Sequence, residues 1–307
     1  RELLTMPVAS TWKSEIVEYK DPITGARVKR LTSAAAHSHH LYFTASSYTK
    51  DGHIVFGSER TGSPQLFLME MPGGTITQLT DEPEVRPQLT CLHPHQDLAY
   101  YTTSRQVKQV NLQTFETAVL YECPEGFRLS LPSITGDGSR IAIAYSQKLA
   151  LSTETGRIYS TMGEHYYQRP ISCVVTIATD FSGPRVIWGE RSWISHVCIS
   201  PVDPDCVVFC HEGGSWVKQR MWVVRADVMH QEAQPLMVQR PGEVAYHEYF
   251  TQDGQIGVQM NAQRPDGSGE SYHCYLRPDG TWLRQYRLPW RPSGHIQSNR
   301  DNSLRIG

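Results

Sequence analysis

The sequence predicts an all-β protein with the architecture of a β-propeller. Two observations support this fold class: short apolar runs with β-type patterning recur between turn residues, and long amphipathic helical patterns are scarce. The polar turns that precede these runs are separated by 45, 41, 67, 49 and 48 residues. A repeat of about 40–50 residues that contains several strands is typical of a propeller blade.

Each repeat follows one order: a polar turn, an apolar strand, a second strand and an outer strand. The apolar runs after the turns are HIVFG (53–57), LAYYTT (98–103), RIAIAY (140–145), CVVFC (206–210) and QIGVQM (255–260). We expect these runs to be inner strands of blades that stack in a ring, because a single blade cannot bury both of its faces. The longer step of 67 residues predicts an insertion within 147–170.

The repeat count predicts a single propeller domain over 1–307, with about five full blades and the start of a sixth. The N-terminal segment 15–32 reads as two strands around a DPITG turn, and we expect it to supply outer strands to the last blade. The sequence then ends at Gly307, just after a first strand. At about 45 residues per blade, we expect the last blades to be incomplete, with roughly 70–90 residues missing.

Composition excludes several classes of protein. The chain has 307 residues, a formal net charge of −2 and 39% hydrophobic residues, which is typical of a globular domain and not of a disordered one. A balanced charge argues against a nucleic-acid partner, and no apolar run of about 18 residues predicts a membrane span. The seven cysteines have irregular spacing without a C-x-x-C pair, which predicts reduced, mostly buried thiols in a cytoplasmic protein. No signal peptide is visible, although a start at Arg1 leaves a trimmed leader open.

The familiar enzyme motifs are absent from the sequence. There is no G-x-S-x-G elbow, Walker A loop, G-x-G-x-x-G fingerprint or H-E-x-x-H helix. The WD dipeptide of the common interaction propellers is also absent. Any chemistry must therefore come from residues that the repeat itself brings together.

Four histidines recur at one phase of the repeat, about 7–13 residues before a turn: His39, His196, His247 and His295. In a propeller such positions gather around the central channel, where imidazoles can hold a metal or transfer a proton. His211, at the end of an apolar strand, can join the same face. A lone histidine before a strand is more often a hydrogen-bonded loop residue, but recurrence at one phase weighs against that interpretation.

Three charged residues near these histidines have open roles. Arg220 precedes the run MWVV, where it either forms an ion pair at a strand edge or grips a carboxylate with two N–H groups. Glu212 and Glu248 each follow a candidate histidine, and each either orients a neighbour or pairs locally.

The ordered motifs resemble the oligogalacturonate lyase (oligogalacturonide lyase) family. They are H-x-x-Y-F, F-C-H-E-G, R-M-W, H-E-[YFW] and S-x-H, found within segments 39–62, 193–227, 239–254 and 293–307. The F-C-H-E-G element followed by R-M-W is the most specific, and the match is weak between 81 and 190. The resemblance implies a seven-bladed propeller that cleaves short α-1,4-linked galacturonides, products of pectin breakdown, by β-elimination.

The resemblance also implies roles for individual residues. The histidine of H-E-[YFW], His247, is implied to be the base, and the arginine of R-M-W, Arg220, to bind the substrate carboxylate. The histidine of S-x-H, His295, is implied to be a ligand of a divalent metal ion such as Mn²⁺. His39, His196 and His211 match family histidines of the same site and are expected to bind substrate. The remaining metal ligands of the family lie in a C-terminal Q-x-x-H-x-H element that this sequence does not contain.

The chemistry agrees with these roles. The C5 proton of a uronate is acidified only by the adjacent carboxylate, so a cation at that carboxylate and a neutral imidazole near the proton are the groups required. The alternative is a non-catalytic propeller that acts as a binding or scaffold module, similar to the periplasmic translocation-associated type. The phased histidines and Arg220 favour the lyase.

Overall fold

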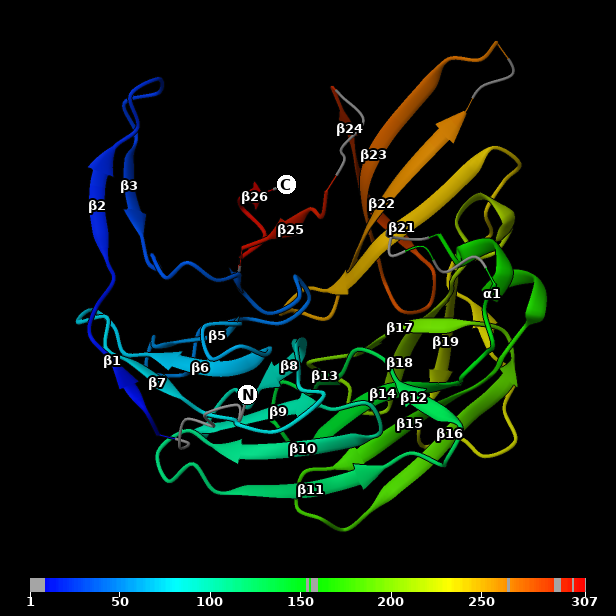
Figure 1. Ribbon diagram of the computed structural model, residues 1–307. Coiled ribbons are helices and arrows are strands. Elements are labelled where there is room, and N and C mark those ends of the chain that lie inside the picture. Colours follow the sequence, from blue (N-terminus) through cyan, green and yellow to red (C-terminus); the bar gives the residue numbers. More distant parts are fainter. Residues whose placement is uncertain are drawn as a thin grey trace. The chain divides into compact units, whose positions relative to one another are not determined.

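The computed structural model describes residues 9–152, 155, 160–263, 266–289, 294–299 and 301–306. The chain divides into two compact units, Arg1–Leu120 and Tyr121–Gly307. Nearly all of the regular structure in the described residues is antiparallel β-sheet, in sheets whose strands follow one another along the chain (Figure 1). The predicted all-β class is therefore confirmed.

The first unit contains two large sheets, with the strand orders β1-β7-β6-β5-β4 and β11-β10-β9-β8. The first comprises β1 (Thr11–Trp12), β4 (Ser38–His39), β5 (Ile54–Ser58), β6 (Gln65–Met69) and β7 (Ile76–Gln78). The second comprises β8 (Arg86–Leu92), β9 (Leu98–Thr102), β10 (Gln106–Asn111) and β11 (Thr117–Glu122), which ends just past the boundary. The two sheets share a core in which Val55 and Leu66 of one contact the cluster of Tyr101 and Val110 of the other.

The second unit contains three large sheets and one small one. The first comprises β12 (Phe127–Leu129), β13 (Ser133–Ile134), β14 (Arg140–Gln147), β15 (Ile171–Ala178) and β16 (Pro184–Arg191). The next two comprise β17 (Ile194–Ile199), β18 (Cys206–His211), β19 (Met221–Arg225) and β20 (Gln234–Pro235), then β21 (Glu243–Phe250), β22 (Ile256–Gln263), β23 (Gly269–Leu276) and β24 (Trp282–Leu288). A final pair comprises β25 (Gln297–Ser298) and β26 (Arg305–Ile306).

Successive antiparallel sheets follow one another along the described residues, in agreement with the propeller fold class that the repeat predicts. The division of 1–307 into about five full blades and the start of a sixth stays a prediction. Apolar side chains of consecutive sheets pack together, as where Val208 and Met221 of β18 and β19 share a core with Val258 and Cys274 of β22 and β23. This stacking buries both faces of the central strands, as a propeller requires.

The prediction that the apolar runs are the innermost strands of their blades was wrong by one strand. The apolar runs expected to be inner strands are the second strands of their sheets: β5, β9, β14, β18 and β22. The strand before each turn was missed because it is short or interrupted: β4 has two residues, and β8, β17 and β21 carry register shifts. Such interruptions break the alternation by which a strand is recognised in a sequence.

The N-terminal segment forms the two strands predicted around the DPITG turn. These are β2 (Val17–Lys20) and β3 (Arg27–Arg30), which pair with each other. Just before them, Glu15 accepts a 3.0 Å hydrogen bond from the nearly buried Arg60 guanidinium and fastens the segment to the first sheet. Their addition to the last blade stays a prediction.

The predicted insertion lies between β14 and β15 and contains the helix α1 (Met162–Gln168). His165 of α1 stacks on Trp193, with ring centroids 4.4 Å apart, and the Tyr166 hydroxyl donates to the carbonyl of Trp216. Trp216 belongs to the short 3₁₀ helix η1 (Gly214–Trp216), which connects β18 to β19. The insertion thus packs against the loop that separates Glu212 from Arg220.

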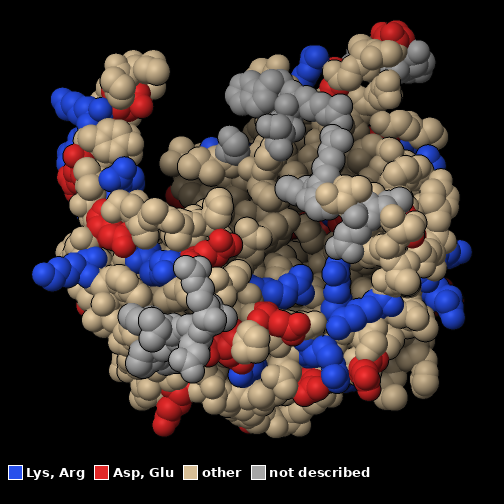
Figure 2. All heavy atoms as spheres, in the orientation of Figure 1, with Lys and Arg blue, Asp and Glu red and all other residues tan. Residues whose placement is uncertain are grey.

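The seven cysteines form no disulfide, and six of them are buried, as their spacing predicts. In the part of the chain that the structure describes, no helix is both long and apolar enough to cross a membrane. Basic and acidic side chains are interspersed over the face drawn in Figure 2, in keeping with the net charge of −2.

Candidate active site

Two β-bulges place the histidines of the second unit. In β17, Ile194 pairs with His211 and Val197 with Phe209, so residues 195 and 196 together oppose one residue of β18. In β21, Tyr246 pairs with Gln259 and Tyr249 with Gly257, so residues 247 and 248 oppose one residue of β22. A bulge of this kind re-aims the side chains of its extra residue. His196 and Glu248 therefore occupy equivalent second positions in neighbouring sheets.

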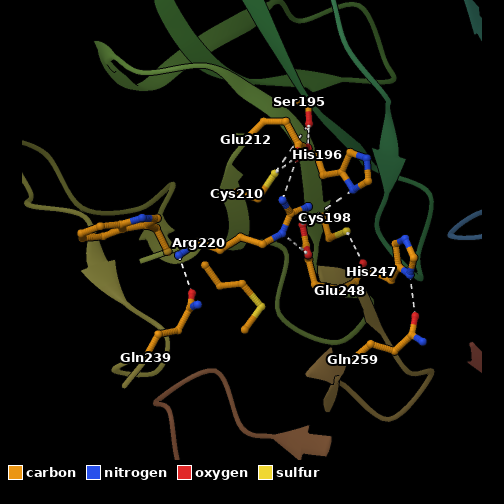
Figure 3. Close-up of polar contacts among 12 residues, drawn as sticks. Ser195, His196, Cys198, Cys210, Glu212, Arg220, Gln239, His247, Glu248 and Gln259 are labelled. Atoms are coloured by element: carbon orange, nitrogen blue, oxygen red, sulfur yellow. Dashed lines mark hydrogen bonds and ion pairs between the residues drawn. The ribbon is translucent and has the colours of Figure 1, made fainter. Parts of the chain in front are cut away.

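Arg220 lies at the centre of a buried cluster of charges (Figure 3). Its Nε and Nη2 atoms donate to the two carboxylate oxygens of Glu248 at 3.1 and 3.3 Å, and Nη1 donates to Glu212 at 3.0 Å. The Glu248 side chain is only 1% exposed. Two-point contact between a planar guanidinium and a carboxylate is among the strongest charge-assisted hydrogen bonds in proteins.

Neighbouring polar groups complete this cluster. The Ser195 hydroxyl donates to Glu212 at 2.6 Å, and the Nδ1 atom of His196 lies 3.7 Å from Glu248. The backbone N–H of Arg220 donates to the Gln239 side chain at 2.6 Å. The cluster thus ties β17 and β21 to the segment that connects β18 and β19.

The charge state of the cluster follows from its geometry. Burial alone raises the pKa of Glu212, but the Arg220 charge and the hydrogen bonds from Ser195 and Arg220 lower it to about 2. Burial likewise opposes ionisation of Glu248, and Arg220 nevertheless holds its pKa below the usual range. Burial lowers the pKa of His196, although the nearby Glu248 carboxylate opposes this shift. At neutral pH the cluster therefore holds two carboxylates, one guanidinium and a neutral imidazole.

One group of potential metal ligands lies inside this cluster, but its chemistry does not fit a divalent cation. Donor atoms of His196, Cys210 and Glu248 lie within 4.8 Å of one another, the one such group found among the described residues. Glu248 is already neutralised by Arg220, and burial raises the pKa of the Cys210 thiol to about 12. A neutral thiol and a resident cation disfavour a second positive charge there.

His247 lies beside this cluster in an unusual backbone conformation. Its φ is +57°, in the left-handed region that residues other than glycine seldom occupy. Nδ1 of its ring lies 2.5 Å from Oε1 of Gln259, and the ring lies 4.3 Å from the ring of His295 between centroids. Burial lowers the pKa of His247, although the hydrogen bond to Gln259 opposes this shift.

The six predicted site residues fall into three groups. Arg220, His196 and His247 lie together around Glu248, and His295 joins them through its ring contact with His247. His211 projects from β18 toward Glu190 and Trp222, with Nε2 2.7 Å from the Glu190 carboxylate. His39 belongs to the first unit, where its ring lies over Gly57 so closely that an added Cβ there would be 2.4 Å from Cε1.

Sequence reasoning missed several residues of the site. Gln259, Gln239, Ser195 and Glu190 were not singled out, and Glu212 and Glu248 were left with open roles. Gln259 is the one polar residue in the otherwise apolar stretch 256–260, which is the signal that would have identified it. The partners Ser195 and Gln239 depend on bulge and loop geometry, which the sequence pattern does not reveal.

Comparisons with known proteins identify the family. A family model described as oligogalacturonate lyase matches residues 11–307. An oligogalacturonate lyase of Dickeya dadantii is 26% identical over 299 residues, which cover 94% of this chain and 74% of that protein. An oligogalacturonide lyase of Pectobacterium atrosepticum is also 26% identical, over 298 residues with the same coverage of both chains.

Two solved structures have the same fold. An oligogalacturonate lyase in complex with manganese superimposes with a TM-score of 0.87 at 24% identity, covering 98% of this chain and 80% of that one. An oligogalacturonate lyase of Vibrio parahaemolyticus gives 0.86 at 21% identity, covering 98% and 79%. The propeller-type succession of sheets, the bulged strands with their histidines and a family match over nearly the whole sequence lead to one conclusion: this chain belongs to the oligogalacturonate lyase family.

Proposed function

We propose that this protein is a lyase that cleaves short α-1,4-linked galacturonides by β-elimination, with His247 as the base. The main observation in support of this proposal is the position of the His247 side chain. A strained bulge holds its imidazole beside the buried Glu248–Arg220 pair, and a hydrogen bond on Nδ1 fixes the ring. Membership of the oligogalacturonate lyase family supplies the substrate class.

The elimination needs a group that accepts the C5 proton of the uronate. With its proton on Nδ1, the neutral His247 ring has its lone pair on Nε2, which is the atom that takes the proton from C5. The electrons of the C5–H bond form the C4–C5 double bond, and the glycosidic oxygen leaves from C4 with a proton from water. The product is an unsaturated uronide at the new non-reducing end.

Arg220 is proposed to bind the carboxylate of the reacting uronate. Three of its five N–H groups already donate to Glu248 and Glu212, so a substrate carboxylate would take the remaining two. The two glutamates hold the guanidinium in one orientation before substrate arrives. Such preorganisation is the main source of electrostatic stabilisation as charge develops on the carboxylate.

His39, His196 and His211 are proposed to contact the sugar. Each carries a polar ring nitrogen capable of hydrogen bonding to a hydroxyl or carboxylate of the oligomer. His196 supports this role by its position in the Arg220 cluster, and His211 by a side chain that remains 18% exposed. His39 is proposed on the family motif alone.

A divalent metal, manganese as in the solved relative, is the proposed cofactor, with His295 as one ligand. The observation that fits is an exposed imidazole lying against the proposed base, outside the Arg220 cluster whose charges disfavour a cation. When bound there, the metal would neutralise charge on the uronate carboxylate. One imidazole supplies one coordination position, so the ion also needs ligands beyond those assigned among the described residues.

The proposal is tested by incubating the purified protein with digalacturonate and recording the ultraviolet absorbance of the unsaturated product. Elemental analysis of the same sample measures bound metal. We expect product formation that chelation removes and Mn²⁺ restores. Tight binding of digalacturonate by the metal-loaded full-length protein, without any product, would instead support the non-catalytic binding module.

A further inference from the structure

We propose that Gln259 is a positioning residue for the base: by accepting the Nδ1–H of His247, its side-chain carbonyl holds the imidazole in the tautomer that carries its lone pair on Nε2. This inference deepens the proposed function and rests on it. The interacting atoms are Nδ1 of His247 and Oε1 of Gln259 (Figure 3).

The environment of Gln259 argues that the amide is retained for this contact. Its side chain lies in β22 with 0% exposure, in a strand whose neighbours Val258 and Met260 are buried and apolar. Its Nε2 group is buried and has no hydrogen-bond partner in the described part of the chain. A buried N–H group without a partner destabilises the fold, so an apolar residue of the same size would pack here more favourably.

The backbone gives a second reason for a fixed ring. His247 occupies the first position of the bulge with a left-handed φ, a conformation that is strained for a residue with a β-carbon. The next residue, Glu248, is anchored by Arg220 through two hydrogen bonds. The main chain is therefore held on one side by Glu248, and the imidazole on the other side by Gln259.

This arrangement assigns each nitrogen one task. A carbonyl oxygen only accepts, so Nδ1 must carry the proton and Nε2 must be the acceptor in the neutral ring. When Nε2 takes the proton from substrate, Nδ1–H remains bonded to the amide. Gln259 is neutral throughout and takes no part in the transfer itself.

The decisive measurement is made on the unchanged protein, and one variant serves only to assign the signals. Nitrogen NMR of protein labelled at its 13 histidines distinguishes protonated from bare ring nitrogens, and the His247 signals are those lost in His247→Gln. At pH 8 we expect Nδ1 to be protonated and Nε2 bare. A His247 ring with Nε2 protonated and Nδ1 bare would overturn the inference, whatever the activity of the protein.

Variants test whether this contact matters for turnover. Gln259→Met keeps the size but removes the acceptor, and we expect kcat to fall about 10–100-fold with KM changed less than about twofold. Gln259→Glu keeps an acceptor and should recover most of kcat. The matched control is Gln78→Met in the first unit, because Gln78 is also a fully buried strand glutamine but bonds the carbonyl of Thr80.

The outcomes separate this inference from the proposed function. Unchanged kcat in Gln259→Met, together with an inactive His247→Ala, would refute the positioning role and leave the proposed base intact. An active His247→Ala would refute the base itself. An equal loss in Gln259→Met and Gln259→Glu would show that packing, and not the acceptor, is what turnover requires.

Discussion

The bulges of β17 and β21 use the same backbone device for different purposes. Both insert one residue into the first strand of a sheet, and both direct polar side chains toward Arg220. In β17 the side chains of Ser195 and His196 lie against the buried carboxylates of Glu212 and Glu248 and belong to the charge cluster. In β21 the first position holds an imidazole that is only half-buried and lies beside a second imidazole. Both bulges set the positions of their side chains, and it is burial with charge pairing that distinguishes the Ser195 and His196 side chains from the proposed base.

The strongest test of this comparison is the substitution His247→Ala. Loss of the proposed base should lower kcat for digalacturonate by about 10²–10⁴-fold, because that is what a positioned general base contributes. Ultraviolet absorbance measures the rate, and circular dichroism checks that the sheets are intact. Turnover close to that of the unchanged protein would exclude His247 as the base.

The supporting role of the charge cluster is tested by Glu248→Ala. Removing one partner of a buried ion pair leaves Arg220 with a single carboxylate, so the free energy of unfolding should fall by about 3–5 kcal/mol in urea denaturation. The control is Asp203→Ala, which breaks the half-exposed pair with Arg225 and should cost less than about 1 kcal/mol. Similar losses in both variants would contradict the contrast between the buried cluster and the surface.

Acid should weaken the cluster in a defined range of pH. The pKa of Glu212 is lowered to about 2 in the folded protein from an ordinary value of 4.5. Its contribution of about 3 kcal/mol is therefore present above pH 4.5 and is lost as pH falls toward 2. Chemical denaturation at several pH values should show a shallower dependence for Glu212→Gln over this range. Identical slopes would show that Glu212 is not charged in the cluster.

The proposed binding of the substrate carboxylate by Arg220 is tested by the substitution Arg220→Lys. A lysine keeps the charge but loses the planar fork, so kcat/KM should fall about 10–100-fold while Arg225→Lys in the exposed pair has little effect. We expect the loss to appear partly in KM, since the remaining N–H groups of Arg220 are proposed to contact the substrate carboxylate. An unchanged kcat/KM would exclude the carboxylate grip.

The sequence predicted the sheets more successfully than the site, for a physical reason. Central strands such as β5 and β18 are buried on both faces, so continuous apolar runs identify them. The first strands carry the histidines, and their bulges break the pattern that reveals a strand. The regular position of the histidines relative to the turns could still be recognised, because it depends only on the length of the repeat. Partners such as Ser195 and Gln239 could not be predicted, because their selection depends on the register of a bulged strand and on loop geometry.

The buried thiols of this chain can report on the local opening of individual sheets. Buried cysteines occur in separate sheets: Cys91 in β8, Cys206 and Cys210 in β18, and Cys274 in β23. A thiol reagent reaches such a side chain only when the strands around it part, so the rate of modification measures local opening sheet by sheet. Mass spectrometry of the labelled peptides can therefore compare the sheet that carries Cys210 with the one that carries Cys91, without introducing a single substitution.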